Sequence, residues 1–228
     1  MGRFISYHLA ENGYNLAIIY NSSSKTELNK TSAFLKTKKI KFIFYKCDIK
    51  NLSSLQKTIQ KIGNDYSKID ILINNSGIIK RIDFNKITPQ LFDDTINTNL
   101  RAMLFTTQYC LPLLNKSKLP QIINFASLGG LLNWANYIPY SVSKAGVIKL
   151  TQLLAKSLAP KIRVNAIAPG TIIIKDEEAG TPQKTPLEKI PLKKYGEPDD
   201  IISALKYLLN SPYITGQVII VDGGRMIN

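Results

Sequence analysis

The sequence has few residues of the kinds that hold metals or link chain segments covalently. Its 228 residues include only two cysteines, Cys47 and Cys110, which lie far apart and form no metal-binding pattern. We expect both side chains to stay reduced and to pack in the core, as free cysteines do in a reducing compartment. The sequence therefore predicts neither a disulfide framework nor a metal site.

Long apolar runs are also missing. The most apolar stretches, near Ile71 and Ile172, are broken by Asn, Gly and Pro well short of the ~20 residues that a membrane-spanning helix needs. Near the start, Arg3, His8 and Glu11 interrupt any apolar core of a signal peptide. We therefore expect a cytoplasmic protein that does not associate with membranes.

Acidic residues are scarce, with 16 Asp and Glu against 30 Lys and Arg, which gives a formal net charge of +14. Such a charge would suit an acidic partner, for example a nucleic acid, an acyl carrier protein or a phosphorylated cofactor. The lysines, however, are spread through the predicted helices, and Ile, Asn and Lys are abundant throughout. We interpret the charge as a solvated basic surface and expect no nucleic-acid binding.

Short apolar segments alternate with amphipathic segments along the whole chain. The expected strands are 15–20, 41–46, 69–73, 121–126, 162–167 and 217–221, and the clearest expected helices are 3–12, 53–66, 90–115, 139–158 and 198–209. This alternation predicts right-handed β-α-β units and a mostly parallel sheet. With no repeat or linker, it indicates one doubly wound, Rossmann-type α/β domain over residues 1–228, which would bind ligands at the carboxyl ends of its strands.

The most informative stretch runs from Gln121 to Lys144. It begins as an apolar strand, and Ser127 follows where the strand ends. A helix then places Tyr140 and Lys144, four residues apart, on one face. We expect the ammonium group to lower the pKa of the phenol from its usual ~10, and the Ser127 hydroxyl to bind an oxygen on which charge develops. Together they predict a proton-transfer site for a carbonyl and its alcohol that needs no metal.

A Tyr-x-x-x-Lys pair alone arises easily by chance in a chain this rich in Tyr and Lys. Here the pair lies 13 positions after a strand-end Ser and is surrounded by further motifs in order. In this arrangement the chain resembles the short-chain dehydrogenase/reductase family over nearly all of its length. The resemblance implies hydride transfer from a nicotinamide to an electrophilic carbon, with Tyr140 as acid, Ser127 steadying the oxygen and Lys144 also holding the cofactor ribose.

The same resemblance implies further site residues. Asn99 matches the residue that kinks a helix in this family and ties the catalytic lysine through water to a proton relay, and it is counted with the catalytic residues. Asp48 would accept a hydrogen bond from the adenine amino group. The remaining residues implied in cofactor binding at strand ends are Ile49, Asn75, Ser76, Gly77, Pro169, Gly170 and Ile172.

The loop after the strand at 15–20 bears on the choice of cofactor. Dinucleotide-binding folds place an acidic residue there to hold the ribose hydroxyls of NAD. This chain has Tyr20, Asn21 and Ser22, followed by two further serines and Lys25. Because no carboxylate would repel a 2′-phosphate, the sequence favours NADP(H) over NAD(H). A plain polar loop is the alternative interpretation.

The first predicted element is a helix, whereas in the family a strand and a Thr-Gly-x-x-x-Gly-x-Gly turn precede it and bring the pyrophosphate to its N-terminus. Here Gly2 matches only the last glycine of that turn. We expect that a segment of roughly 12 to 16 residues, a strand plus its turn, is missing; a decayed gene is the alternative. Either would weaken dinucleotide binding.

The substrate is the least determined feature. Residues 174–197 occupy the position of the family's substrate lid, and the aromatic residues Trp134 and Tyr137 favour a flat or apolar ligand unless they serve packing. The motifs together resemble 3-oxoacyl-acyl-carrier-protein reductases, whereas segments such as 158–165 and 222–225 resemble pteridine reductases. We therefore consider a reductase of carbonyl substrates, including thioesters on an acyl carrier protein, then a pterin reductase, then an inactive dinucleotide-binding or scaffold protein.

The family resemblance also implies a homodimer or homotetramer built through the helices at 90–115 and 139–158. Apolar residues on these two helices would form either the interface or the core; they are Leu104, Phe105, Tyr109, Val147, Leu150 and Leu154.

Overall fold

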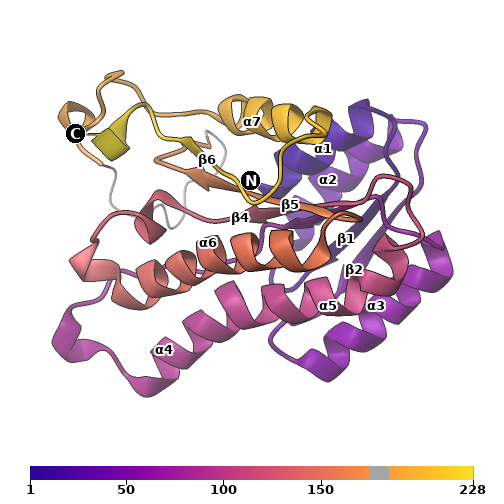
Figure 1. The fold of residues 1–228 in the computed structure, drawn as a ribbon, viewed down its shortest axis with the longest axis horizontal. Coiled ribbons are helices and arrows are strands. Elements are labelled where there is room, and N and C mark those ends of the chain that lie inside the picture. The colour runs from indigo at the N-terminus through magenta and orange to yellow at the C-terminus, as the bar shows by residue number, and fades with distance from the viewer. Residues whose placement is uncertain (175–184, 228) are drawn as a thin grey trace. The chain divides into compact units, whose positions relative to one another are not determined.

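A computed structural model describes residues 1–174 and 185–227 (Figure 1). It has an α/β architecture whose strands pair in parallel, as the alternation of apolar and amphipathic segments predicts. The chain divides into two compact units, residues 1–67 and 68–228, which are described in turn. That they form one domain stays a prediction, and residues 175–184 of the expected lid lie outside the described part.

The first unit contains α1 (Gly2–Glu11), β1 (Leu16–Tyr20), α2 (Lys25–Lys36), β2 (Phe42–Lys46) and α3 (Leu52–Tyr66). Strands β1 and β2 are parallel, and Tyr20 is paired with Lys46 at their carboxyl ends. Gly13 follows α1 with a φ of +77°, a backbone conformation that favours glycine and commonly ends helices. Side chains cap the next two helices, because Ser24 accepts from Glu27 N and Asn51 accepts from Ser54 N.

The second unit contains a parallel sheet with helices on both of its faces. Its strands are β3 (Ile71–Asn74), β4 (Gln121–Phe125), β5 (Arg163–Pro169) and β6 (Val218–Val221), in that spatial order. The helices are α4 (Pro89–Ile96), α5 (Ala102–Leu114), α6 (Ile138–Leu158) and α7 (Pro198–Asn210). Helix α7 lies on one side of this sheet, and α5 and α6 lie on the other (Figure 1). All residues of β4 are buried, as a central strand covered on both faces requires.

The helix predicted over 90–115 is not uniform. Five residues, Asn97–Arg101, form a π-helical turn between α4 and α5. A π turn contains an extra residue and widens the helix locally, which is a common feature of functional sites. Asn99, at its centre, is fully buried. The kink that the family resemblance implied at this residue is therefore present as a π turn.

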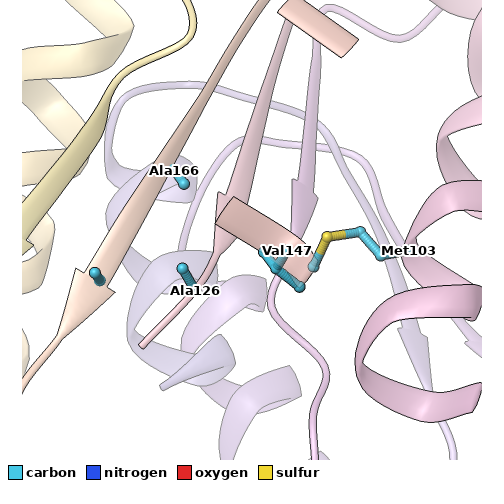
Figure 2. Packing of buried hydrophobic residues seen from close by; sticks show 5 residues of the cluster. Met103, Ala126, Val147 and Ala166 are labelled. Atoms are coloured by element: carbon cyan, nitrogen blue, oxygen red, sulfur yellow. The ribbon is translucent and has the colours of Figure 1, made fainter. Parts of the chain in front are cut away.

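Small side chains let α5 and α6 lie close to the sheet. Figure 2 shows Met103 of α5 reaching toward Val147 of α6, with Ala126 and Ala166 on the strand side. Val147 is fully buried and therefore belongs to the core, whereas Leu104 on α5 is 38% exposed. The six apolar residues considered for an interface thus include at least one core residue.

Candidate active site

Ser127 lies directly after β4, at the carboxyl end of the second unit's sheet. Its side chain is 5% exposed, and its Oγ accepts a hydrogen bond from the Gly129 N–H at 3.1 Å. This bond occupies one lone pair of the hydroxyl and fixes its direction at the start of a short 3₁₀ turn, Leu128–Gly130. The Ser127 hydroxyl also lies near enough to the Tyr140 phenol to lower its pKa. The structure therefore brings together the two hydroxyl groups that the sequence predicted to act on one oxygen.

Two glycines allow the beginning of α6 to approach the end of β4. A Cβ atom added to Gly130 would lie 2.6 Å from the backbone carbonyl carbon of Lys144, and one added to Gly129 would lie 3.1 Å from the ring of Tyr140. Any side chain larger than hydrogen at Gly130 would therefore push α6 away. The Gly-Gly pair thus sets the position of the helical turn that carries both Tyr140 and Lys144.

Lys144 is almost completely buried, at 4% exposed. Its Nζ donates a hydrogen bond to the Phe125 carbonyl at 2.7 Å and lies 5.9 Å from the centroid of the Tyr140 ring. Burial lowers the pKa of the Lys144 amine to about 8, because the charged form loses its hydration. Lys144 is therefore still mostly protonated at pH 7 but close to its titration range.

The expectation that Lys144 would lower the pKa of Tyr140 is wrong for this structure. Burial raises the pKa of the Tyr140 phenol above its usual 10, and the neighbouring Ser127 hydroxyl offsets this rise only in part. The physical reason is that the phenolate would be largely cut off from water. The loss of hydration destabilises the phenolate more than the neighbouring groups stabilise it. Tyr140 is consequently held in its protonated form at neutral pH.

Asn99 fastens the segment after β3 to the helix that carries Tyr140. Its Oδ1 accepts from Ile78 N at 2.8 Å, and its Nδ2 donates to Ile78 O and to Ser143 Oγ, both at 2.9 Å. Ser143 Oγ in turn donates to the Tyr140 carbonyl at 2.7 Å. In these contacts Asn99 acts as a positioning residue, and the water-mediated relay that the resemblance implied stays a prediction.

The loop after β3 runs close to Lys144. A Cβ atom added to Gly77 would lie 3.2 Å from Asn99 Oδ1 and 3.4 Å from Lys144 Nζ. The backbone of Gly77, which carries no side chain, therefore faces the Lys144 amine. A flat ring or a ribose can approach the amine there. Asn75 is half-buried, whereas Ser76 and Gly77 are exposed. Gly77 thus supplies the kind of surface that a dinucleotide's nicotinamide end requires.

The predicted residues after β5 lie at the same edge of this sheet, because β3, β4 and β5 are parallel and in register. Pro169 ends β5, and the Gly170 N–H donates to Val221 O at 2.8 Å. A Cβ at Gly170 would lie 2.8 Å from Asp222 Cα, so no side chain fits there. Ile172 forms an isolated bridge with Gly196. Residues that follow β3, β4 and β5 therefore lie at the same edge of the sheet as Ser127.

The remaining predicted residues belong to the first unit. Tyr20 is the last residue of β1, and Asn21 and Ser22 follow it as exposed residues. Asp48 follows β2, is half-buried together with Ile49, and accepts from Lys50 N at 3.0 Å. Gly2 is the first residue of α1. These residues mark the carboxyl ends of β1 and β2 and the start of a helix, which are the positions the prediction gave them.

Sequence reasoning missed two residues near this centre. Ser143, fully buried, links Asn99 to the backbone of Tyr140. Its position three residues after Tyr140 could have indicated the helix-backbone contact, although not the contact with Asn99. Arg225 lies with its guanidinium carbon 4.8 Å from the centroid of Trp134. No sequence pattern connects residues so far apart in the chain.

Trp134 is a packing residue as well as a neighbour of the site. It contacts Tyr137 edge to face, with ring centroids 5.7 Å apart, and a Cβ at Gly129 would lie 2.8 Å from its ring. Of the two interpretations of the aromatic pair, the structure therefore supports packing. Within the residues described, no cluster of three or more His, Cys, Asp or Glu side chains could hold a metal ion. The helices described are all too short or too polar to cross a membrane.

The geometry defines a class of protein. Two neighbouring hydroxyl groups, a buried amine one helical turn away and a bare-backbone loop beside it form a site for proton transfer at an oxygen. A carbonyl could be reduced there by a dinucleotide cofactor. Comparison with known proteins identifies the family.

A family model described as enoyl-(acyl carrier protein) reductase matches residues 1–225. The 3-oxoacyl-[acyl-carrier-protein] reductase FabG of Staphylococcus epidermidis is 34% identical over 98% of this chain and 93% of its own length. The protein of the same name from Thermotoga maritima is 35% identical over 80% of this chain and 76% of its own length. A short-chain dehydrogenase of Burkholderia cenocepacia, solved in complex with NADP, matches with a TM-score of 0.89 and 25% identity, covering 98% of this chain and 92% of its own.

The chain therefore belongs to the short-chain dehydrogenase/reductase family, and it is an oxidoreductase that uses a nicotinamide dinucleotide. The family, the fold class and the enzyme class predicted from the sequence are confirmed. The comparisons give no support to a pteridine reductase or to an inactive scaffold.

Proposed function

We propose that this protein reduces 3-oxoacyl thioesters, carried by an acyl carrier protein, with NADPH. One observation carries the proposal: the end of β4 brings the Ser127 hydroxyl next to the Tyr140 phenol, and the buried amine of Lys144 lies one helical turn beyond Tyr140. Two hydroxyl donors at one point suit a carbonyl oxygen that becomes an alcohol. The relatives named above as 3-oxoacyl-[acyl-carrier-protein] reductases support this choice of carbonyl.

In the proposed reaction, Tyr140 acts as the acid. The bound cofactor would supply a hydride to the carbonyl carbon. The Tyr140 hydroxyl gives its proton to the carbonyl oxygen, the ketone becomes a secondary alcohol, and the phenolate left behind regains a proton from water. Ser127 donates a hydrogen bond to the same oxygen as charge develops. Tyr140 carries its proton at neutral pH, as an acid must before it can donate one.

Lys144 has two roles in this proposal. Its ammonium group would hold the ribose hydroxyls of the cofactor, and it would stabilise the transient Tyr140 phenolate electrostatically. The amine already lies beside the bare backbone of Gly77, so a sugar can approach without displacing a side chain. Asn99 keeps that backbone in place through Ile78.

The residues that would hold the cofactor fall into two groups. The nicotinamide end would contact strand-end residues of the second unit, namely Asn75, Ser76, Gly77, Tyr140, Lys144, Pro169, Gly170 and Ile172. The adenosine and pyrophosphate end is assigned from the sequence to Gly2, Tyr20, Asn21, Ser22, Asp48 and Ile49. The preference for NADP(H) rests on the loop after β1, where no carboxylate stands at residues 20–24. The Burkholderia cenocepacia relative, solved with NADP, supports it.

We also propose a homo-oligomer formed through α5 and α6. Leu104 on α5 is 38% exposed, and Val142 and Leu153 on α6 are 48% and 56% exposed. Apolar side chains that stay exposed on two adjacent helices are typical of an interface between subunits. A single species with the mass of a monomer in light scattering, at micromolar concentration, would contradict this.

The substrate is tested by following NADPH oxidation with matched acceptors. We expect turnover with a 3-oxobutyryl thioester and little with dihydropterins or simple quinones. The corresponding 3-hydroxybutyryl thioester should be oxidised by NADP⁺ in the reverse direction, because proton and hydride return along the same path. Turnover of a dihydropterin in preference to the thioester would contradict the proposal, as would tight NADPH binding with no turnover of any acceptor.

A further inference from the structure

Arg225 begins a short 3₁₀ turn, Arg225–Ile227, that follows β6. Its guanidinium lies over the indole ring of Trp134, 4.8 Å from the ring centroid. This stacking holds a long, flexible side chain in one place, because a planar guanidinium gains both dispersion and cation–π attraction on an aromatic face. The structure therefore fixes a positive charge next to the loop that follows Ser127.

The carboxylate of Asp222, three residues before Arg225, is hydrogen-bonded to backbone N–H groups. Asp222 accepts from Gly224 N at 2.8 Å through Oδ1 and from Met226 N at 2.6 Å through Oδ2. Within the residues described, the Arg225 guanidinium has no hydrogen-bonded or ion-paired acceptor at all. Burial lowers the pKa of the Arg225 guanidinium, and the charge of Asp222 offsets this in part. A partly desolvated guanidinium with unused donors binds an anion more strongly than an exposed one.

Trp134 connects this cation to the reaction centre. A Cβ atom added to Gly129 would meet the Trp134 ring at 2.8 Å and the Tyr140 ring at 3.1 Å, so both rings lie over the same glycine. Arg225 is therefore separated from Tyr140 by one aromatic side chain. A group bound at Arg225 and a carbonyl bound at Tyr140 can belong to the same small molecule.

We propose that Arg225, held on Trp134, binds a phosphate group on the non-reacting arm of the substrate and so selects phosphate-bearing thioesters over neutral ones. This rests on the proposed function, because it assumes a thioester whose reacting carbonyl lies at Tyr140. The planar fork of arginine matches the oxygens of a phosphate, and its charge complements them. Arg225 is thus a specificity-determining residue rather than a participant in proton or hydride transfer.

The test compares two substrates with the same reacting group. 3-Oxobutyryl-coenzyme A carries phosphates, and the 3-oxobutyryl thioester of N-acetylcysteamine carries none. We expect the ratio of their kcat/KM values to fall about tenfold in Arg225→Ala, mainly through KM for the phosphate-bearing substrate, as for the loss of one charge-assisted hydrogen bond. Arg225→Lys, which keeps the charge but not the planar fork, should show an intermediate ratio. Lys206→Ala removes an exposed charge on α7 and is the matched control; it should leave the ratio unchanged.

A separate binding measurement distinguishes failure of this inference from failure of the proposed function. Calorimetry should show pantetheine 4′-phosphate binding more tightly than pantetheine to the unaltered protein, with the difference lost in Arg225→Ala. If neither thioester is reduced, the proposed function fails and this binding difference still decides the role of Arg225. An equal substrate ratio, or an equal binding difference, in the unaltered protein and Arg225→Ala would overturn the inference.

Discussion

The carboxyl end of β4 and the carboxyl end of β1 differ in how strongly the protein buries and fixes the side chains there. At β4, the side chains of Ser127, Asn99 and Lys144 are each at most 5% exposed and are held by hydrogen bonds to other protein groups. At β1, Asn21 and Ser22 are exposed residues of a polar loop. The difference teaches that the chemical groups are fixed in advance, because proton transfer needs precise distances, whereas cofactor selection requires only the sign of a surface charge.

The largest effect is expected when a single oxygen, the Tyr140 hydroxyl, is removed from the site at the carboxyl end of β4. Tyr140→Phe should lower turnover by ~10²–10⁴-fold, because the proton donor is lost while the ring stays in place. NADPH binding, followed by fluorescence, should change little. Tyr207→Phe, at an exposed position on α7, is the control. Retained turnover in Tyr140→Phe would show that the acid lies elsewhere.

A second test probes how tightly the region is packed. Gly130→Ala should reduce stability by ~1–3 kcal/mol and also reduce turnover, because its Cβ would lie 2.6 Å from the Lys144 backbone and α6 would have to move. Gly13→Ala is the matched comparison. A Cβ added to Gly13 would lie within 4 Å of no other atom, but the φ of Gly13 is +77°. It should cost about 1 kcal/mol through strain and leave turnover unaffected. Urea unfolding and kcat together separate the two cases, and equal effects on kcat would break the comparison.

The third test uses the buried charge. Burial lowers the pKa of Lys144 from 10.5 to about 8, so between these values the unfolded chain binds more protons than the folded chain. The stability of the unaltered protein should therefore rise with pH relative to Lys144→Met, by on the order of 1–3 kcal/mol between pH 8 and pH 10.5. The difference in free energy of unfolding is the measurement. Parallel pH profiles would mean that Lys144 is not desolvated.

The smallest expected effect concerns the β1 loop. Ser22→Asp should shift the ratio of NADPH to NADH affinity toward NADH by about tenfold, because a carboxylate there repels a 2′-phosphate and can hold the ribose hydroxyls instead. Ser53→Asp adds the same charge at an exposed position of α3 and should leave the ratio as it is. An unchanged ratio in Ser22→Asp would remove this loop from cofactor selection.

Sequence reasoning succeeded where the information is local. A strand followed by Ser127, and a helix with Tyr140 and Lys144 four residues apart, follow from short-range periodicity, and α6 begins within one residue of its predicted start. Periodicity did not reveal that Asn97–Arg101 forms a π turn; only the family resemblance implied a kink at Asn99. The π turn appears in the structure with Asn99 bound to Ile78, 21 positions away.

The two larger misses have a common cause. The pKa of Tyr140 was expected to fall because Lys144 is near in sequence, but it rises because burial, a property of the whole fold, dominates. The sequence analysis included Arg225 only within the segment 222–225 and assigned it no role, since no local pattern links it to Trp134. Both depend on which distant segments enclose a side chain, and no spacing rule contains that information.

Asn99 binds both polar groups of one residue, the N–H and the C=O of Ile78. A neighbouring strand would make the same pair of bonds. The Asn99 side-chain amide therefore replaces the pair of backbone hydrogen bonds that a neighbouring strand would make. It holds the segment around Ile78 in place after the chain has left β3. An ionised aspartate cannot donate a hydrogen bond, and leucine can neither donate nor accept one, so neither, though similar in size, could take the place of Asn99.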